Sequence, residues 1–127
     1  MIQIFGTKKC SETRKAERFF RERGVPIQVI DLADKAPSVG ELRSMAQAVG
    51  GVWKLFDKTG KRAKEKGLGH ALLGDPDIER KLLEDPLLMR TPVVRNGRAA
   101  TVGEVTPELQ AQWKDWANVS AKDSVKK

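Results

Sequence analysis

The sequence lacks a second cysteine, which excludes any disulfide bond within the chain. Cys10 is the only cysteine among the 127 residues. A chain without internal disulfides suits a reducing compartment, and we expect the protein in the cytoplasm. A lone cysteine is either an inert core residue or a reactive thiol, and composition does not choose between these two.

Long hydrophobic runs, a leader and a second histidine are also missing. No run approaches the ~20 apolar residues that span a bilayer, so we expect no association with a membrane. The chain opens on a strand-like segment instead of a charged and then apolar leader. His70 is the only histidine, which leaves a zinc site or a Cys-His pair unsupported, and we interpret it as structural. We expect no bound metal or cofactor.

Acidic residues are fewer than basic residues, and aromatic residues are few. The 24 basic against 17 acidic residues give a formal net charge of +7, which favours anionic partners. Several of the basic residues crowd residues 54–66, a pattern that we interpret as a solvated basic loop and helix face. Aromatic side chains do not interleave with this cluster as base stacking requires, so nucleic acid is not an expected partner.

Hydrophobic periodicity predicts a β-α-β unit followed by a mostly helical insertion at residues 36–88. The unit covers residues 2–32, with its helix at 11–23. Ser38 and Glu41 form a capping box that opens the first helix of the insertion, and an N-cap aspartate at Asp75 opens a second. Between these two helices we expect short helical turns joined by the basic loop.

The last third of the chain returns to strands and closes with a helix. The Asn96-Gly97 pair interrupts a strand-like segment at 92–102 and predicts a β-hairpin. A helix with an apolar stripe is expected from Thr106. Residues 118–127 are polar and basic, and we expect them to form a disordered tail.

This order of elements predicts a single α/β domain over residues 1–117 with a thioredoxin-like fold, and the loop after the first strand makes a resemblance specific. That loop reads Gly-Thr-Lys-Lys-Cys-Ser-Glu-Thr-Arg-Lys-Ala from Gly6 to Ala16. It resembles the arsenate reductase and Spx family, where a Cys-x-x-x-Arg motif joins the first strand to the first helix. Further similar segments are VIDL at 29–32, KEKGL at 64–68, PLL at 86–88 and TPVV at 91–94.

The chemical argument for Cys10 also stands without the family. A thiol at the start of a helix faces free amides and the positive end of the helix dipole, which favour the thiolate. Arg14 follows one turn later, where its guanidinium can pair with the thiolate or hold an oxyanion, and Lys8 and Lys9 add positive charge. The alternative is a buried, inert cysteine beside a surface arginine.

The resemblance implies roles for two more residues. Thr13 stands where dithiol members of the wider fold carry a second cysteine, so an oxidised Cys10 needs an external thiol: glutathione, a glutaredoxin or a thioredoxin. Thr13 either donates a hydrogen bond to the sulfur or faces the core as an ordinary helix residue. Pro92 resembles the proline that is cis in this fold, and a trans proline at a strand start is the alternative.

The chain departs from the family's reductases in the arginines that bind the oxyanion. An arginine precedes the proline in the family, whereas here Thr91 does, and Arg90 is one place earlier and expected on the opposite face. The insertion loop offers Lys58 as the candidate substitute for a second arginine, and the end of the hairpin offers none for a third. With Arg14 alone retained, an oxyanion loses several charge-assisted hydrogen bonds, each worth ~1.5–3 kcal/mol, which argues against efficient arsenate reduction.

Two hypotheses follow. In the first, the protein is a monomeric monothiol oxidoreductase: Cys10 attacks an oxidised thiol or a small oxyanion, Arg14 steadies the charge, and an external thiol regenerates the cysteine. The residues expected to bind substrate or thiol are Lys9, Thr13, Lys58, Arg90, Thr91 and Pro92. In the second, the chain is a non-enzymatic regulator that binds RNA polymerase, as Spx-type members do, although it lacks their Cys-x-x-Cys switch.

Overall fold

The computed structural model describes residues 1–69 and 72–126, with side chains through Asn118. His70, which the sequence interpretation treats as structural, lies outside the described residues. None of the described helices is both long enough and apolar enough to cross a membrane.

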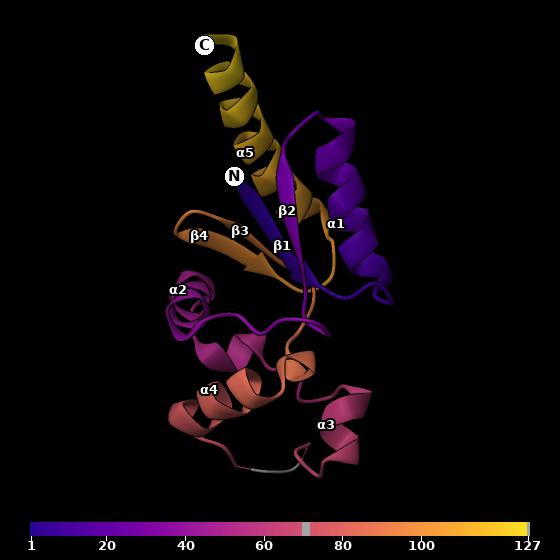
Figure 1. Ribbon diagram of the computed structural model, residues 1–127, viewed down its shortest axis with the longest axis vertical. Coiled ribbons are helices and arrows are strands. Elements are labelled where there is room, and N and C mark those ends of the chain that lie inside the picture. The colour runs from indigo at the N-terminus through magenta and orange to yellow at the C-terminus, as the bar shows by residue number, and fades with distance from the viewer. Residues whose placement is uncertain (70–71, 127) are drawn as a thin grey trace.

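A four-stranded mixed sheet forms the centre of the structure (Figure 1). Its strands are β1 (Ile2–Gly6), β2 (Ile27–Asp31), β3 (Val93–Asn96) and β4 (Ala99–Val102), in the order β2-β1-β3-β4. β1 pairs with β2 in parallel, and the other two pairs are antiparallel. The crossover between the parallel strands is helix α1 (Ser11–Glu22), so the predicted β-α-β unit is confirmed.

The insertion contains helices and helical turns, as expected. They are α2 (Val39–Val49), the 3-10 turn η1 (Val52–Leu55), α3 (Lys61–Glu65), α4 (Asp75–Glu84) and the 3-10 turn η2 (Pro86–Leu88). The capping box of α2 is confirmed, because Ser38 Oγ accepts from the Glu41 amide and the Glu41 carboxylate accepts from the Ser38 amide. The predicted N-cap of α4 is off by one residue: Gly74 is the cap and Asp75 is the first helical residue.

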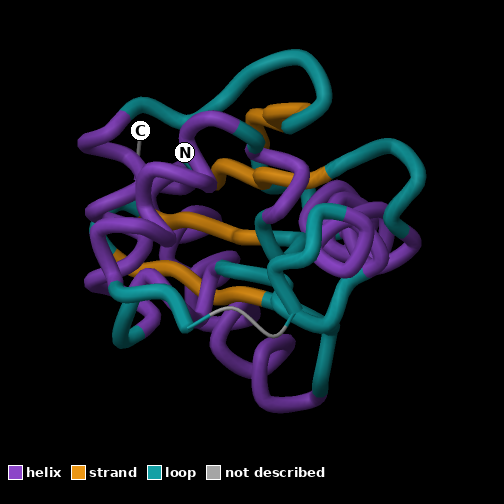
Figure 2. Tube along the Cα trace, turned by 90° about the horizontal axis from the view of Figure 1, so that it is seen from below, coloured by secondary structure: helices purple, strands orange, loops and turns teal. Residues whose placement is uncertain are grey.

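Helices cover both faces of the sheet (Figure 2). Each face has its own apolar cluster. Side chains alternate between the faces along a strand, so neighbouring residues join different clusters. Ile4 and Val94 pack with residues of α1 and the closing helix, including Phe20 and Trp113. Phe5 and Val93 pack against the insertion. The strands thus hold two separate helical layers together.

The hairpin of β3 and β4 is confirmed, but its turn lies one residue later than expected. Asn96 pairs with Ala99, so the two-residue loop is Gly97-Arg98. Asn96 stays in the strand because it also pairs with Ile2 of β1. Gly97, with φ of 60°, then occupies the first loop position, where glycine tolerates the left-handed backbone.

The closing helix α5 runs from Pro107 to Lys126, so residues 118–126 are helical and the expectation of a disordered tail is wrong for them. Thr106 opens α5 as predicted, because its Oγ1 accepts from the Leu109 amide at 3.2 Å. Neither glycine nor proline occurs after Pro107, so nothing in the backbone stops the helix. Figure 1 shows its C-terminal half extending beyond the sheet.

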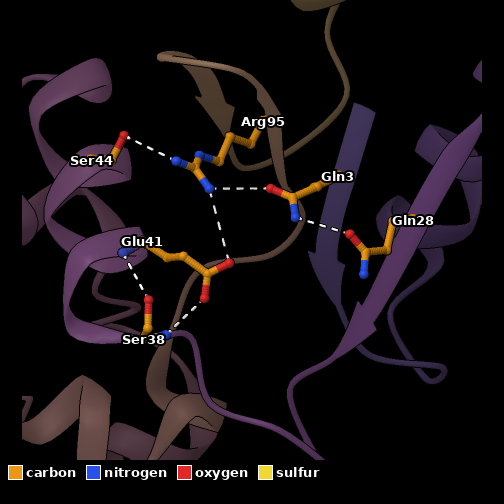
Figure 3. Close-up of polar contacts among 6 residues, drawn as sticks. All are labelled: Gln3, Gln28, Ser38, Glu41, Ser44 and Arg95. Carbon is orange, nitrogen blue, oxygen red and sulfur yellow. Dashed lines mark hydrogen bonds and ion pairs between the residues drawn. The ribbon is translucent and has the colours of Figure 1, made fainter. Parts of the chain in front are cut away.

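A polar network attaches α2 to the sheet (Figure 3). Arg95 on β3 donates to Gln3 Oε1 at 3.2 Å and to Ser44 Oγ of α2 at 3.3 Å. Gln3 in turn donates to Gln28 on β2 at 3.0 Å. The Glu41 carboxylate lies 3.9 Å from Arg95 Nη1. The guanidinium of Arg95 therefore links β3 to β1 and to α2, and Gln3 extends the network to β2.

Candidate functional site

Cys10 lies at the junction that the sequence predicts, as the N-cap residue of α1. Its backbone is extended, with φ of −81° and ψ of 113°, and its carbonyl accepts from the Arg14 amide at 3.2 Å. The Cys10 amide donates to the Thr7 carbonyl at 3.2 Å, which closes the loop after β1. The side chain is only partly buried, so a small reactant can reach the sulfur.

Thr91 brings a second segment onto the sulfur, from 81 residues away in the chain. Its Oγ1 donates to Cys10 Sγ at 3.3 Å, and its carbonyl oxygen lies 3.9 Å from the same sulfur. The peptide bond between Thr91 and Pro92 is cis, as the resemblance implied. Thr91 therefore belongs to the site by direct contact with Cys10, and buried Pro92 places it there.

The surroundings of Cys10 lower its pKa. Burial by itself raises the pKa of the thiol, but the nearby hydroxyls of Thr13 and Thr91 and the amides of Thr13 and Glu12 outweigh burial. These groups stabilise a thiolate because each directs a positive dipole end at the sulfur. The local chemistry thus favours a reactive thiol over an inert core cysteine.

The structure places Thr13 in the second of the two roles that the sequence left open. It is 3% exposed and faces the core, and a Cβ on Gly6 would collide with its side chain. Among the described residues, Thr13 Oγ1 forms no hydrogen bond. Its hydroxyl is nevertheless close enough to the sulfur to lower the pKa of Cys10.

Arg14 does not lie over the sulfur, contrary to the expectation from its spacing. Its side chain is exposed, and Nη1 donates to the Lys8 carbonyl at 2.7 Å. Within residues 1–69 and 72–126, no hydrogen bond joins Arg14 to Cys10, and Arg14 is not among the groups that shift the pKa of Cys10. The carbonyl of Lys8 offers this guanidinium a close acceptor, which holds it against the loop after β1. Lys9 is also exposed, next to Cys10 in the same loop.

Lys58 and Arg90 lie together in a pocket of about 830 Å³ to which Cys10 does not contribute. The guanidinium of Arg90 packs on Gly103, where a Cβ would lie 2.6 Å from Nη2, and Nη1 is 3.5 Å from the Lys54 carbonyl oxygen. Thr91 faces the sulfur while Arg90 faces this pocket. Arg90 and Thr91 therefore have different surroundings, while the placement of Arg90 on the opposite face stays a prediction.

Glu12 is a supporting residue that sequence reasoning missed. Its carboxylate accepts from the Val105 amide at 2.9 Å and pairs with Lys15 at 3.0 Å. The hydrogen bond from Val105 is the main reason that the pKa of Glu12 is lowered. This contact ties the first turn of α1 to the loop after β4. Because this hydrogen bond joins residues that are 93 positions apart in the sequence, no local sequence pattern predicts it.

The described residues include no cluster of three histidine, cysteine, aspartate or glutamate side chains that could hold a metal ion. The groups around the sulfur are two threonine hydroxyls and the amides at the start of α1. Such an arrangement can stabilise a thiolate and supports nucleophilic attack by the sulfur.

Comparison with known proteins agrees with this geometry. The chain is 30% identical over 116 residues to an arsenate reductase from Neisseria meningitidis serogroup A, covering 87% of this chain and 96% of that protein. It is 28% identical over 115 residues to the uncharacterized protein YusI of Bacillus subtilis, with 88% of this chain and 98% of YusI covered.

Solved structures show the same fold. An arsenate reductase from Vibrio cholerae superposes with a TM-score of 0.71 at 29% identity, covering 80% of this chain and 88% of that one. An ArsC family-related protein from Bacteroides fragilis gives a TM-score of 0.77 at 24% identity, covering 90% and 95%. The ArsC family model matches residues 5–111. With its thioredoxin-like fold and its cysteine at the start of α1, the chain belongs to the ArsC family.

Proposed function

We propose that this arsenate reductase-like protein is a monothiol reductase whose Cys10 forms a mixed disulfide that an external thiol resolves. The observation that carries the proposal is the environment of the sulfur: it is reachable, it lies at the start of α1, and Thr91 Oγ1 donates to it at 3.3 Å. A thiolate in such a setting is a nucleophile toward disulfide sulfur.

The proposed cycle has two exchange steps. The Cys10 thiolate attacks one sulfur of an oxidised thiol, so that a new sulfur–sulfur bond forms at Cys10 and the other sulfur leaves as a thiolate. The thiolate of glutathione, a glutaredoxin or a thioredoxin then attacks the substrate-derived sulfur of the mixed disulfide. It forms a new disulfide with that sulfur, and the bond to Cys10 breaks so that Cys10 leaves as a thiolate. The second step requires an outside thiol because the chain has no other cysteine.

An oxidised thiol is preferred to arsenate in this proposal because the Cys10 site is poor in cations. Thr91, and not an arginine, contacts the sulfur, while Arg14 binds the Lys8 carbonyl. Lys58 and Arg90 line a separate pocket. A multiply charged oxyanion at Cys10 would therefore lack the charge-assisted hydrogen bonds that offset its loss of water.

Mass spectrometry of the protein incubated with oxidised glutathione tests the proposal. We expect one glutathione per chain on Cys10, none on a Cys10→Ser variant, and release of the adduct by reduced glutathione with glutaredoxin. A wild-type protein that stays unmodified under conditions that oxidise free cysteine would overturn the proposal.

A pull-down from cell lysate separates this proposal from the alternative of a regulator. Mixed disulfides that depend on Cys10 support the reductase. RNA polymerase subunits retained equally by the wild type and by Cys10→Ser would favour the regulator.

A further inference from the structure

A pocket of about 830 Å³ has no Cys10 in its lining and plays no part in the thiol chemistry derived above. Its walls come from η1 and the loop after it, from residues 72–74 just before α4, from Ile78 of α4 and from Arg90. This volume falls in the range of ~300–1,000 Å³ that is usual for small-molecule sites.

The walls carry exposed apolar side chains. Trp53 is 57% exposed and Leu72 is 98% exposed, and both line the pocket with Phe56, Leu73 and Ile78. Large apolar groups left in water gain free energy when a ligand covers them. The pocket therefore suits a ligand with an apolar body.

The same pocket is positively charged. Lys54, Lys58 and Arg90 line it, and Asp57 is the one acidic residue among its lining residues. The carboxylate of Asp57 is turned toward Gly60, at the opening of α3, where an added Cβ would collide with it. Cations thus outnumber anions at the pocket, which favours a ligand with a negative charge.

Backbone contacts join the Arg90 side of the pocket to η1. The Arg90 amide donates to the Leu55 carbonyl at 2.7 Å, and Phe56 and Met89 form a β-bridge. These contacts bring charged Arg90 next to apolar Phe56 in the wall of the pocket.

We infer that the pocket binds an organic anion with an apolar body. The inference goes beyond the proposed function, because binding in this pocket needs no thiol and Cys10 is not among its lining residues. An inorganic oxyanion does not fit, because it could not use the apolar walls.

NMR titration of the isotope-labelled Cys10→Ser protein tests the inference with octanoate as the probe. We expect octanoate to shift the indole signal of Trp53 and the amide signals of residues 72–74. Acetate, which has the charge without the apolar body, and 1-octanol, which has the body without the charge, should each bind at least tenfold more weakly. Each methylene removed from water tightens binding by about fourfold, so octanoate should bind more tightly than acetate.

Charge variants provide the matched comparison. Arg90→Gln and Lys58→Gln should each weaken octanoate binding by about fivefold, as expected for partly exposed charge pairs. Arg98→Gln, an exposed arginine on the hairpin loop, should leave it unchanged. Equal binding of octanoate and acetate, or shifts confined to residues outside the pocket, would overturn the inference.

The outcome is independent of the test with oxidised glutathione. Octanoate binding by Cys10→Ser together with an unreactive wild-type thiol would leave the pocket established and remove the proposed reductase. A reactive thiol with no octanoate binding would overturn the inference about the pocket and leave the proposed reductase in place.

Discussion

At the scale of single residues, the reactivity of Cys10 depends on hydroxyl and amide groups instead of on a neighbouring cation. Arg14 donates to Lys8, whereas Thr13 and Thr91 lower the pKa of the thiol. Short-range hydrogen bonds to a partly buried sulfur lose little strength to screening by salt. The thiolate should therefore persist at high ionic strength.

Replacing Thr91 with valine should raise the pKa of Cys10, because the change removes the donor at 3.3 Å and keeps the size of the side chain. The wild-type thiol should be alkylated with a midpoint below that of free cysteine, and the variant with a higher midpoint. The rate of reaction with iodoacetamide over a pH series measures both.

The control for this experiment is Thr59→Val, a change at an exposed threonine in the loop after η1. Its alkylation midpoint should match that of the wild type. A Thr91→Val midpoint equal to that of the wild type would show that the hydroxyl does not stabilise the thiolate.

At the scale of elements, local sequence chemistry sets where α2 starts. Ser38→Ala removes the acceptor of the Glu41 amide, a bond of 3.1 Å, and should lower the free energy of unfolding by about 1 kcal/mol. Urea unfolding measures the change. Gln47→Ala, at an exposed position of the same helix, should stay within about 0.5 kcal/mol of the wild type.

Helix α5 depends instead on a contact with the sheet. Trp113 is fully buried, and its indole N–H donates to Thr101 Oγ1 on β4 at 3.0 Å. Trp113→Phe leaves that hydroxyl buried without its donor and opens a small cavity, so it should destabilise the protein by about 2 kcal/mol. Thermal unfolding monitored by circular dichroism provides the measurement.

Trp53→Phe is the matched change at an exposed tryptophan and should alter stability by less than about 0.5 kcal/mol. If both variants unfolded at the same temperature, α5 would not be held by Trp113.

At the scale of the whole molecule, carboxylates paired with basic side chains make stability depend on pH. Burial raises the pKa of Asp85, but hydrogen bonds from Arg62 and Lys66 outweigh it and lower the pKa. A lowered folded-state pKa means that this stabilisation is present above the unfolded value of ~3.9 and is lost as pH falls through the folded value. The ion pairs join α3 to the residue before η2.

Asp85→Asn should therefore lose less stability than the wild type when the pH is lowered from neutral to about 3, because the variant has no carboxylate to protonate. Urea unfolding at the two pH values measures the difference. The exposed loop residue Asp34 offers the control Asp34→Asn, which should lose as much as the wild type. An equal loss for Asp85→Asn would show that these ion pairs do not stabilise the fold.

The sequence predicted the features that depend on residues close together in the chain. The β-α-β unit, the capping box at Ser38 and the hairpin follow from periodicity, caps and turn residues, which act over a few positions. The turn itself moved by one residue because Asn96 also pairs with β1, a partner that the hairpin sequence does not contain. Residues 118–126 are helical although they are polar and basic, because such a composition alone does not end a helix.

By itself, the sequence determined the order of elements, the excess of positive charge and a single thiol at the start of a helix. Only the tertiary structure decided that Thr91 contacts the sulfur, that Arg14 turns to Lys8 and that Arg90 faces a pocket. The physical reason is distance along the chain. Thr91 and Cys10 meet through the pairing of β1 with β3, and an arginine takes whichever acceptor the packed backbone leaves within its reach.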